Sequence, residues 1–333
     1  LAGLGVGVGD RVVALLPNST HAVVAFLATA SLGAIWSSCS PDFGARAVAE
    51  RFTQIEPTVL IAVDGYRYNG RPFDVRRTIL DLRVQLPSLR ATVIVPYLGS
   101  ADPVSDGAVP GPGSHPVIGW QELLAMGGNA KLEYEPVPFD HPLWVLYSSG
   151  TTGLPKGIVH GHGGIVLEHL KALALHCDLG AGERFFWYTT TGWMMWNFLV
   201  GGLMVGSTIV LYDGSPTYPG PSVLWKLAED ETVAYFGTSA PYLQACMKAD
   251  LHPAADHDLA SLRAVGSTGA PLTPEGFRWV ARELPGVQIA SISGGTDLCT
   301  AFIAAAPDVP VWLGELSCRT LGSAVAAYDE DGR

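Results

Sequence analysis

Short runs of valine, isoleucine and leucine alternate along this chain with stretches whose apolar residues recur at helical spacing. The short runs predict buried strands, and the stretches between them predict helices that cover a sheet. Such alternation is typical of α/β proteins with parallel sheets. The predicted strands are residues 11–16, 34–39, 58–63, 92–96, 143–147, 185–188, 208–212, 233–236, 264–267 and 288–291.

Two of the intervening helices have clear start signals. Ser19 precedes a helical pattern over residues 20–32, and Pro274 with Glu275 opens another that continues through Glu283. Serine is a common cap, and proline is favoured in the first helical turn. Two longer apolar stretches, 22–36 and 198–212, fall short of the roughly 20 residues that cross a bilayer. We therefore expect no membrane span and interpret both as helix–strand pairs of a core.

Glycines and hydroxyl residues crowd into one segment directly after the apolar run 142–147. Backbone N–H groups of such a turn can converge on one anion, hydroxyls add donors, and a lysine adds a positive charge. The sequence therefore predicts a phosphate-binding loop, with the candidate residues Ser148, Ser149, Gly150, Thr151, Thr152, Gly153 and Lys156.

The segment is not a Walker A motif. Counted from Gly150, Pro155 stands where the second glycine belongs, and Gly157 stands where the hydroxyl that binds magnesium belongs. An ordinary P-loop kinase or ATPase is therefore disfavoured. The alternative is a flexible surface loop, but such loops rarely follow an aromatic-rich strand or end in this ordered series.

The series Thr-Thr-Gly-Leu-Pro-Lys-Gly at 151–157 resembles the phosphate loop of the adenylate-forming superfamily. This superfamily contains acyl-CoA synthetases, peptide-synthetase adenylation domains and luciferases. The opening residues 9–18 resemble its first core strand. Within the superfamily the acetoacetate–CoA ligases are most similar, on the stretches 35–44, 188–197, 291–297 and 314–322.

The resemblance implies two stacked parallel-sheet subdomains with covering helices, followed by the start of a distorted β-barrel. Residues 1–182 would form the first subdomain, which ends with the phosphate loop. Residues 183–305 would form the second, with the acyl pocket and the adenine and magnesium segment, and 306–333 would begin the barrel. A separate C-terminal domain is expected outside this stretch.

The resemblance also implies a reaction in two steps with ATP, Mg²⁺ and CoA. A carboxylate attacks the α-phosphorus of ATP and releases pyrophosphate, and the thiol of CoA then displaces AMP. Lys156 and Thr296 would be catalytic, and Asp297 would hold magnesium directly or through a water, since most of the superfamily has glutamate there. The remaining nucleotide-binding residues would be Gly269, Ala270, Pro271, Ser293, Gly294 and Gly295. The alternative for Thr296–Asp297 is a simple helix cap.

The acyl pocket would lie beside Gly294, where acetyl-CoA synthetases carry a tryptophan that limits the pocket to two carbons. We expect an extended loop on the other wall, formed by Trp193, Met194, Met195, Trp196 and Asn197. Methionine fills irregular gaps, and a pocket longer than acetate fits acetoacetate. Asn197 and Ser293 are candidates to bind the 3-keto oxygen. The alternative is that the Trp-Met-Met-Trp series belongs to the core.

Composition narrows the class of protein. Of 333 residues, 48% are hydrophobic and 15% are charged, which describes a globular chain with a large interior. The net charge of −11 and the lack of a basic run argue against nucleic acid as a partner. Five scattered cysteines suggest neither a disulfide framework nor a zinc site, so we expect reduced thiols and a cytoplasmic protein.

Three other functions stay open at this point. The first is a ligase for another short- or medium-chain acid. The second is a nucleotide-binding module with little turnover, because the superfamily's adenylation lysine, ribose-binding aspartate and domain hinge would all lie beyond residue 333. The third is a peptide-synthetase adenylation domain, which would need an acidic residue in the pocket, and the expected wall has none.

Overall fold

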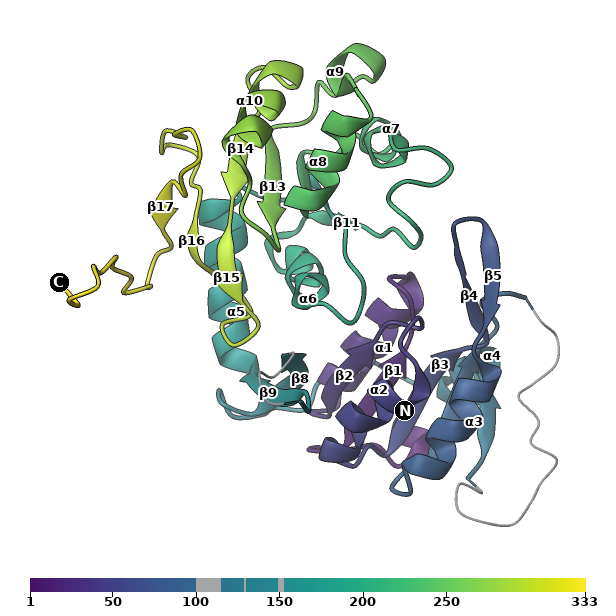
Figure 1. The fold of residues 1–333 in the computed structure, drawn as a ribbon. Coiled ribbons are helices and arrows are strands. Elements are labelled where there is room, and N and C mark those ends of the chain that lie inside the picture. The colour runs from purple at the N-terminus through teal and green to yellow at the C-terminus, as the bar shows by residue number, and fades with distance from the viewer. Residues whose placement is uncertain (100–114, 129, 149–152) are drawn as a thin grey trace. The chain divides into compact units, whose positions relative to one another are not determined.

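The computed structural model describes residues 1–99, 115–128, 130–148 and 153–333 (Figure 1). The chain divides into two units, each built around its own parallel sheet. Unit 1 comprises Leu1–Ile165, Thr190–Trp196 and Tyr212–Ser215. Unit 2 comprises Val166–Thr189, Asn197–Leu211 and Pro216–Arg333.

The sheet of unit 1 has the strand order β7-β6-β3-β1-β2-β8-β9. Every neighbouring pair is parallel except β8 and β9, which are antiparallel. The strands are β1 (Arg11–Leu15), β2 (Ile35–Cys39), β3 (Val59–Val63), β6 (Ala91–Val95), β7 (Val117–Gly119), β8 (Pro142–Ser148) and β9 (Lys156–Gly161). Both β3 and β6 are buried at every position, and apart from Thr92 their residues are apolar without alternation.

Helices and one hairpin complete unit 1. They are η1 (Ala2–Leu4), α1 (Thr20–Ser31), α2 (Ala45–Phe52), η2 (Thr53–Ile55), α3 (Arg76–Gln85), α4 (Trp120–Gly127) and the antiparallel pair β4 (Gly65–Tyr68) and β5 (Arg71–Asp74). The helix α4 packs along β6 and β7, and α2 packs against α3. The helix α5 (His162–Lys171) begins in unit 1 and ends in unit 2.

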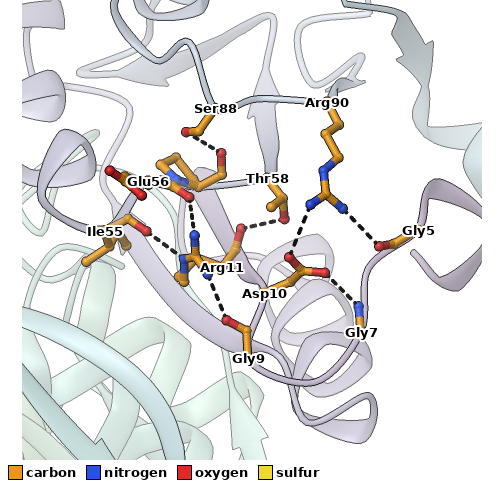
Figure 2. A network of polar contacts seen from close by, with 11 residues as sticks. Gly5, Gly7, Gly9, Asp10, Arg11, Ile55, Glu56, Thr58, Ser88 and Arg90 are labelled. Atoms are coloured by element: carbon orange, nitrogen blue, oxygen red, sulfur yellow. Dashed lines mark hydrogen bonds and ion pairs between the residues drawn. The ribbon is translucent and has the colours of Figure 1, made fainter.

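A polar network fixes the amino end of β1 (Figure 2). The guanidinium of Arg11 donates to three backbone carbonyls: Gly9 at 2.9 Å, Ile55 at 2.6 Å and Glu56 at 2.7 Å. Asp10 accepts from the Gly7 N–H at 3.0 Å. Arg11 therefore ties the start of β1 to the end of η2, directly before β3.

The sheet of unit 2 has the order β11-β10-β12-β13-β14, and all its neighbouring strands are parallel. The strands are β10 (Arg184–Trp187), β11 (Thr208–Val210), β12 (Tyr235–Ser239), β13 (Ala264–Thr268) and β14 (Gln288–Ser291). A small antiparallel sheet follows, made of β15 (Ser293–Gly295), β16 (Thr300–Ala304) and β17 (Cys318–Arg319). The described residues form no closed barrel.

Unit 2 also contains several helical segments, of which α8 packs against β12 and α10 packs against β14. They are η3 (Ala172–His176), α6 (Met194–Gly201, which begins in unit 1), η4 (Gly202–Val205), α7 (Val223–Asp230), α8 (Ala240–Lys248), α9 (Pro253–Asp256) and α10 (Pro274–Glu283). Inside the core, the indole of Trp187 lies over two glycines of neighbouring strands. A Cβ atom added to Gly237 would lie 2.1 Å from this ring, and one added to Gly266 would lie 2.9 Å from it.

The predicted fold class is confirmed, since helices cover parallel sheets in both units. The helix α10 has the predicted bounds, because Pro274 stands in its first turn and the Thr273 hydroxyl caps it by accepting from the Gly276 N–H at 3.2 Å. Most strand ends differ from the prediction by no more than two residues, whereas β12 spans Tyr235–Ser239 where the sequence predicted 233–236. Within the described ranges, no helix is long and apolar enough to cross a bilayer.

Candidate functional site

The candidate phosphate loop connects the two antiparallel strands β8 and β9. Ser148 pairs with Lys156 in the register of this hairpin, and Lys156 is the exposed first residue of β9. Gly153 has a φ of 112°, a conformation that side chains rarely adopt. The predicted residues Ser149, Gly150, Thr151 and Thr152 lie outside the described residues. The sequence predicted the strand before the loop and missed the strand after it.

Hydrogen bonds to α2 and η2 hold both ends of this loop. On the entering strand, the Tyr147 hydroxyl donates to the Arg51 carbonyl at 2.8 Å. On the leaving side, the Gln54 amide donates to the Pro155 carbonyl at 2.9 Å. The Arg51 guanidinium lies 5.1 Å from the centre of the Phe43 ring and 6.0 Å from that of Tyr147. Burial raises the pKa of the Tyr147 phenol, so this group stays neutral and keeps its proton to donate.

A second candidate segment, Thr190–Trp196, lies at the carboxyl ends of β1 and β2 in unit 1. The Thr191 hydroxyl donates to the Leu16 carbonyl at 2.6 Å, and the Ser38 hydroxyl donates to the Thr191 carbonyl at 2.8 Å. A Cβ atom on Gly192 would lie 3.3 Å from the Ser40 nitrogen. The strand ends therefore fix the segment that carries Trp193.

The expected extended loop over Trp193–Asn197 is wrong, because the helix α6 begins at Met194. Met194, Met195 and Trp196 are 8%, 5% and 0% exposed. Successive helical residues point about 100° apart, so three buried neighbours mean that this turn is enclosed on several sides. The Trp196 ring stacks on Trp36 with centroids 6.3 Å apart, which favours the core interpretation for Trp196. A pocket role for Trp193, Met194 and Met195 stays a prediction.

Asn197, the next residue of α6, is also fully buried. Its amide oxygen and nitrogen have no hydrogen-bond partner among the described residues. Leaving buried polar atoms unpaired costs about 1–3 kcal/mol. Such a cost calls for a partner in the working molecule, and a polar substrate atom would provide one.

Two candidate nucleotide segments lie together at the carboxyl ends of β13 and β14 in unit 2. Gly269 follows β13 with a φ of 85°, and Ala270 and Pro271 are exposed beside it. The Thr268 hydroxyl donates to the Ile292 carbonyl at 3.0 Å, which ties this turn to the start of the Ser293–Gly295 strand. Ligands of open α/β sheets bind at this edge.

Thr296 and Asp297 stand in the turn of the β15–β16 hairpin. The helix-cap alternative is wrong, because a strand follows them. The Cys299 N–H donates to the Gly295 carbonyl at 3.0 Å, and Cys299 itself has a φ of 54°. His169 donates from Nε2 to the Cys299 carbonyl at 2.9 Å and so holds the end of the turn. The Asp297 side chain is exposed, and Thr296 is half-buried.

Gly294 has a packing role as well as its predicted place in the acyl pocket. A Cβ atom there would meet the Thr300 carbonyl oxygen of the neighbouring strand at 2.0 Å, whereas one on Gly295 would meet nothing within 4 Å. Any side chain at position 294 therefore requires β15 and β16 to move apart. The role of Gly294 in the acyl pocket stays a prediction.

Two other titratable side chains, His160 and Cys299, are held by packing and hydrogen bonds within the fold. The Nδ1 atom of His160 accepts from the Trp144 indole at 3.1 Å. Cys299 is fully buried, and burial raises the pKa of its thiol. Within the part of the chain that the structure describes, no three histidine, cysteine or acidic side chains gather as a metal site would require.

Gln54, Arg51 and His169 were missed by sequence reasoning, because no local motif marks them. Gln54 is 101 positions from its partner Pro155.

The chain is similar to known proteins over nearly its whole length. A family model described as AMP-binding enzyme matches residues 1–328. The acetoacetyl-coenzyme A synthetase of Rhizobium meliloti (strain 1021) is 49% identical over 331 residues, which are 99% of this chain and 50% of that protein. The acetoacetyl-CoA synthetase of Gallus gallus is 42% identical over 334 residues, which are 99% of this chain and 49% of that protein.

A solved structure is also similar to this chain. It is the acetoacetyl-CoA synthetase from Streptomyces lividans, with a TM-score of 0.92 and 54% identity. The match covers 100% of this chain and 50% of that one. The chain spans about half the length of the curated relatives it matches.

Proposed function

The chain belongs to the AMP-binding enzyme family, and on this premise we propose that it takes part in the ATP-dependent ligation of acetoacetate to CoA. The products would be acetoacetyl-CoA, AMP and pyrophosphate, formed through acetoacetyl-AMP. Similarity along the whole chain to proteins named acetoacetyl-CoA synthetases carries the proposal. The chain spans about half of those relatives. In line with the resemblance to the superfamily, we assign part of the cycle to a C-terminal domain, and we place the reaction in the cytoplasm.

In the first step, a carboxylate oxygen of acetoacetate forms a bond to the α-phosphorus. The bond from that phosphorus to the bridging oxygen breaks, and pyrophosphate leaves with the electron pair. No side chain needs to act as a nucleophile. Lys156 neutralises charge on the departing phosphates, and the Thr296 hydroxyl donates to an oxygen of the α-phosphate. In the second step, the CoA thiol attacks the acyl carbon and AMP leaves.

We assign magnesium to Asp297. Its carboxylate is exposed in the hairpin turn beside the Thr296 hydroxyl. Magnesium is usually held by one or two carboxylates together with substrate phosphates, so a single carboxylate at this position fits the ion. Bound there, the ion would supply charge neutralisation at the phosphates.

We assign recognition of the 3-keto oxygen to Asn197. Its amide is buried and has no partner among the described residues, so a keto oxygen would satisfy the donor. A pocket built around such a group rejects an analogue without the polar atom, because the protein group is then left unpaired. Ser293 is the second candidate and is only half-buried.

The proposed function predicts the order of acids in an assay of ATP-dependent pyrophosphate release. Acetoacetate should give a higher kcat/KM than butyrate, which has the same chain length and lacks the keto oxygen, and a higher one than acetate. Hexanoate serves as the control for a longer pocket. A preference for butyrate over acetoacetate would contradict the substrate and would favour a ligase for another short-chain acid.

Replacing the phosphate-loop lysine, Lys156→Ala, should lower the rate of acetoacetyl-AMP formation about 100-fold, because a preorganised charge at the phosphates is lost. The measurement is single-turnover formation of the adenylate. Lys248→Ala is the matched control, since Lys248 is an exposed lysine at the end of α8. Wild-type kinetics in Lys156→Ala would remove this residue from the mechanism.

Replacing the buried amide, Asn197→Leu, should abolish the preference for acetoacetate over butyrate. Stability should stay equal or rise, because an apolar group replaces unpaired polar atoms. Thr238→Val is the control: its hydroxyl on β12 is likewise buried without a partner among the described residues, and this change should leave acid preference intact. An unchanged preference in Asn197→Leu would assign keto recognition elsewhere.

A further inference from the structure

The amide of Gln54 is committed to two carbonyl oxygens of different segments. Its Nε2 atom donates to Glu50 in the preceding helical turn at 2.7 Å and to Pro155 at 2.9 Å. The opposite amide orientation would set Oε1 against two carbonyl oxygens, which cannot donate. Hydrogen bonding therefore fixes which way this side chain faces. One of its two N–H groups serves the helix and the other serves the phosphate loop.

Arg11 holds the backbone that follows Gln54, and Figure 2 shows Arg11 with Ile55 and Glu56. The two carbonyls that directly follow Gln54 belong to Ile55 and Glu56, and both accept from the Arg11 guanidinium. Glu56 has a φ of 47°, which turns the chain sharply after η2. Charge-assisted bonds to a guanidinium are stronger than neutral ones. Arg11 thus fixes the end of η2 from which the Gln54 side chain extends.

The Pro155 carbonyl is an effective point at which to hold the loop. Its peptide bond to Lys156 is planar, and the proline ring limits φ at position 155. A hydrogen bond to this oxygen therefore orients the plane from which Lys156 continues. Pro155 is buried, whereas Lys156 is exposed. The hydrogen bond from Gln54 therefore fixes the backbone at Lys156 and leaves the lysine ammonium group accessible.

We propose that Gln54 is a positioning residue for Lys156: through the Pro155 carbonyl it presets the direction in which the lysine meets the phosphates of ATP. This inference rests on the proposed function. Gln54 does not need to touch the nucleotide. It lowers the cost of ordering the lysine when ATP binds, in the way that preorganised groups generally gain affinity.

The test is Gln54→Met in the intact protein, because methionine keeps the length of the side chain and cannot donate. Loss of one hydrogen bond should raise KM for ATP about three- to tenfold, while KM for acetoacetate stays within twofold of wild type. Amide hydrogen exchange over residues 153–161 should become faster in the same variant. Thermal stability is measured in parallel, and we expect little change because Gln54 is exposed.

Gln85→Met is the matched control. The Gln85 amide donates at 3.2 Å to the backbone carbonyl of Asp81, four positions earlier, just as the Gln54 amide donates to the carbonyl of Glu50. Gln85 also lies at the end of a helix. This change removes the local helical bond alone. It should leave KM for ATP and the exchange over 153–161 unchanged.

The outcomes separate the inference from the function. Wild-type KM for ATP and wild-type exchange in Gln54→Met, with an active parent protein, would overturn the positioning role alone. Equal increases in KM for ATP and for acetoacetate would indicate a general structural defect and would also overturn it. If the wild-type protein neither binds ATP in calorimetry nor releases pyrophosphate, the proposed function fails and the positioning role fails with it.

Discussion

Parallel strand pairing is the constraint on which both halves of this chain depend. Parallel strands bring their carboxyl ends to one edge of a sheet, so loops that are distant in sequence meet there. In unit 1 this edge holds the Thr191 segment against Leu16 and Ser38. In unit 2 it brings the turn after β13 next to the start of β15. These two segments are held by the carboxyl ends of parallel strands, whereas the phosphate loop and the Thr296–Asp297 turn belong to antiparallel hairpins.

Side chains that donate to backbone carbonyls make these positions precise. Thr191, Thr268, His169, Tyr147 and Gln54 each donate to a carbonyl of another segment. A loop carbonyl held in this way has a fixed orientation, and so does the peptide bond that continues from it. This arrangement suits a reaction that depends on orientation and charge neutralisation without a protein nucleophile.

The sequence was sufficient for the fold class, the superfamily and most strands, because apolar runs and the phosphate-loop motif are local signals. It was insufficient where distant contacts decide the conformation. Met194, Met195 and Trp196 begin α6, and Trp196 packs against Trp36 and Phe26, which lie far from it in sequence. Thr296 and Asp297 stand in a hairpin because β16 pairs with β15. Gln54 carries no motif, since its partner follows a hundred residues later. Asn197 was a candidate from the sequence, and only the structure shows that its amide is buried and has no hydrogen-bond partner among the described residues.

A crystal structure with a non-hydrolysable acetoacetyl-adenylate analogue tests the account most directly. We expect the adenine to lie against Gly269, Ala270 and Pro271. The phosphate mimic should lie within hydrogen-bonding distance of the Thr296 hydroxyl, and the keto oxygen should bind the Asn197 amide. An analogue bound elsewhere, with the carboxyl ends of β13 and β14 empty, would contradict it.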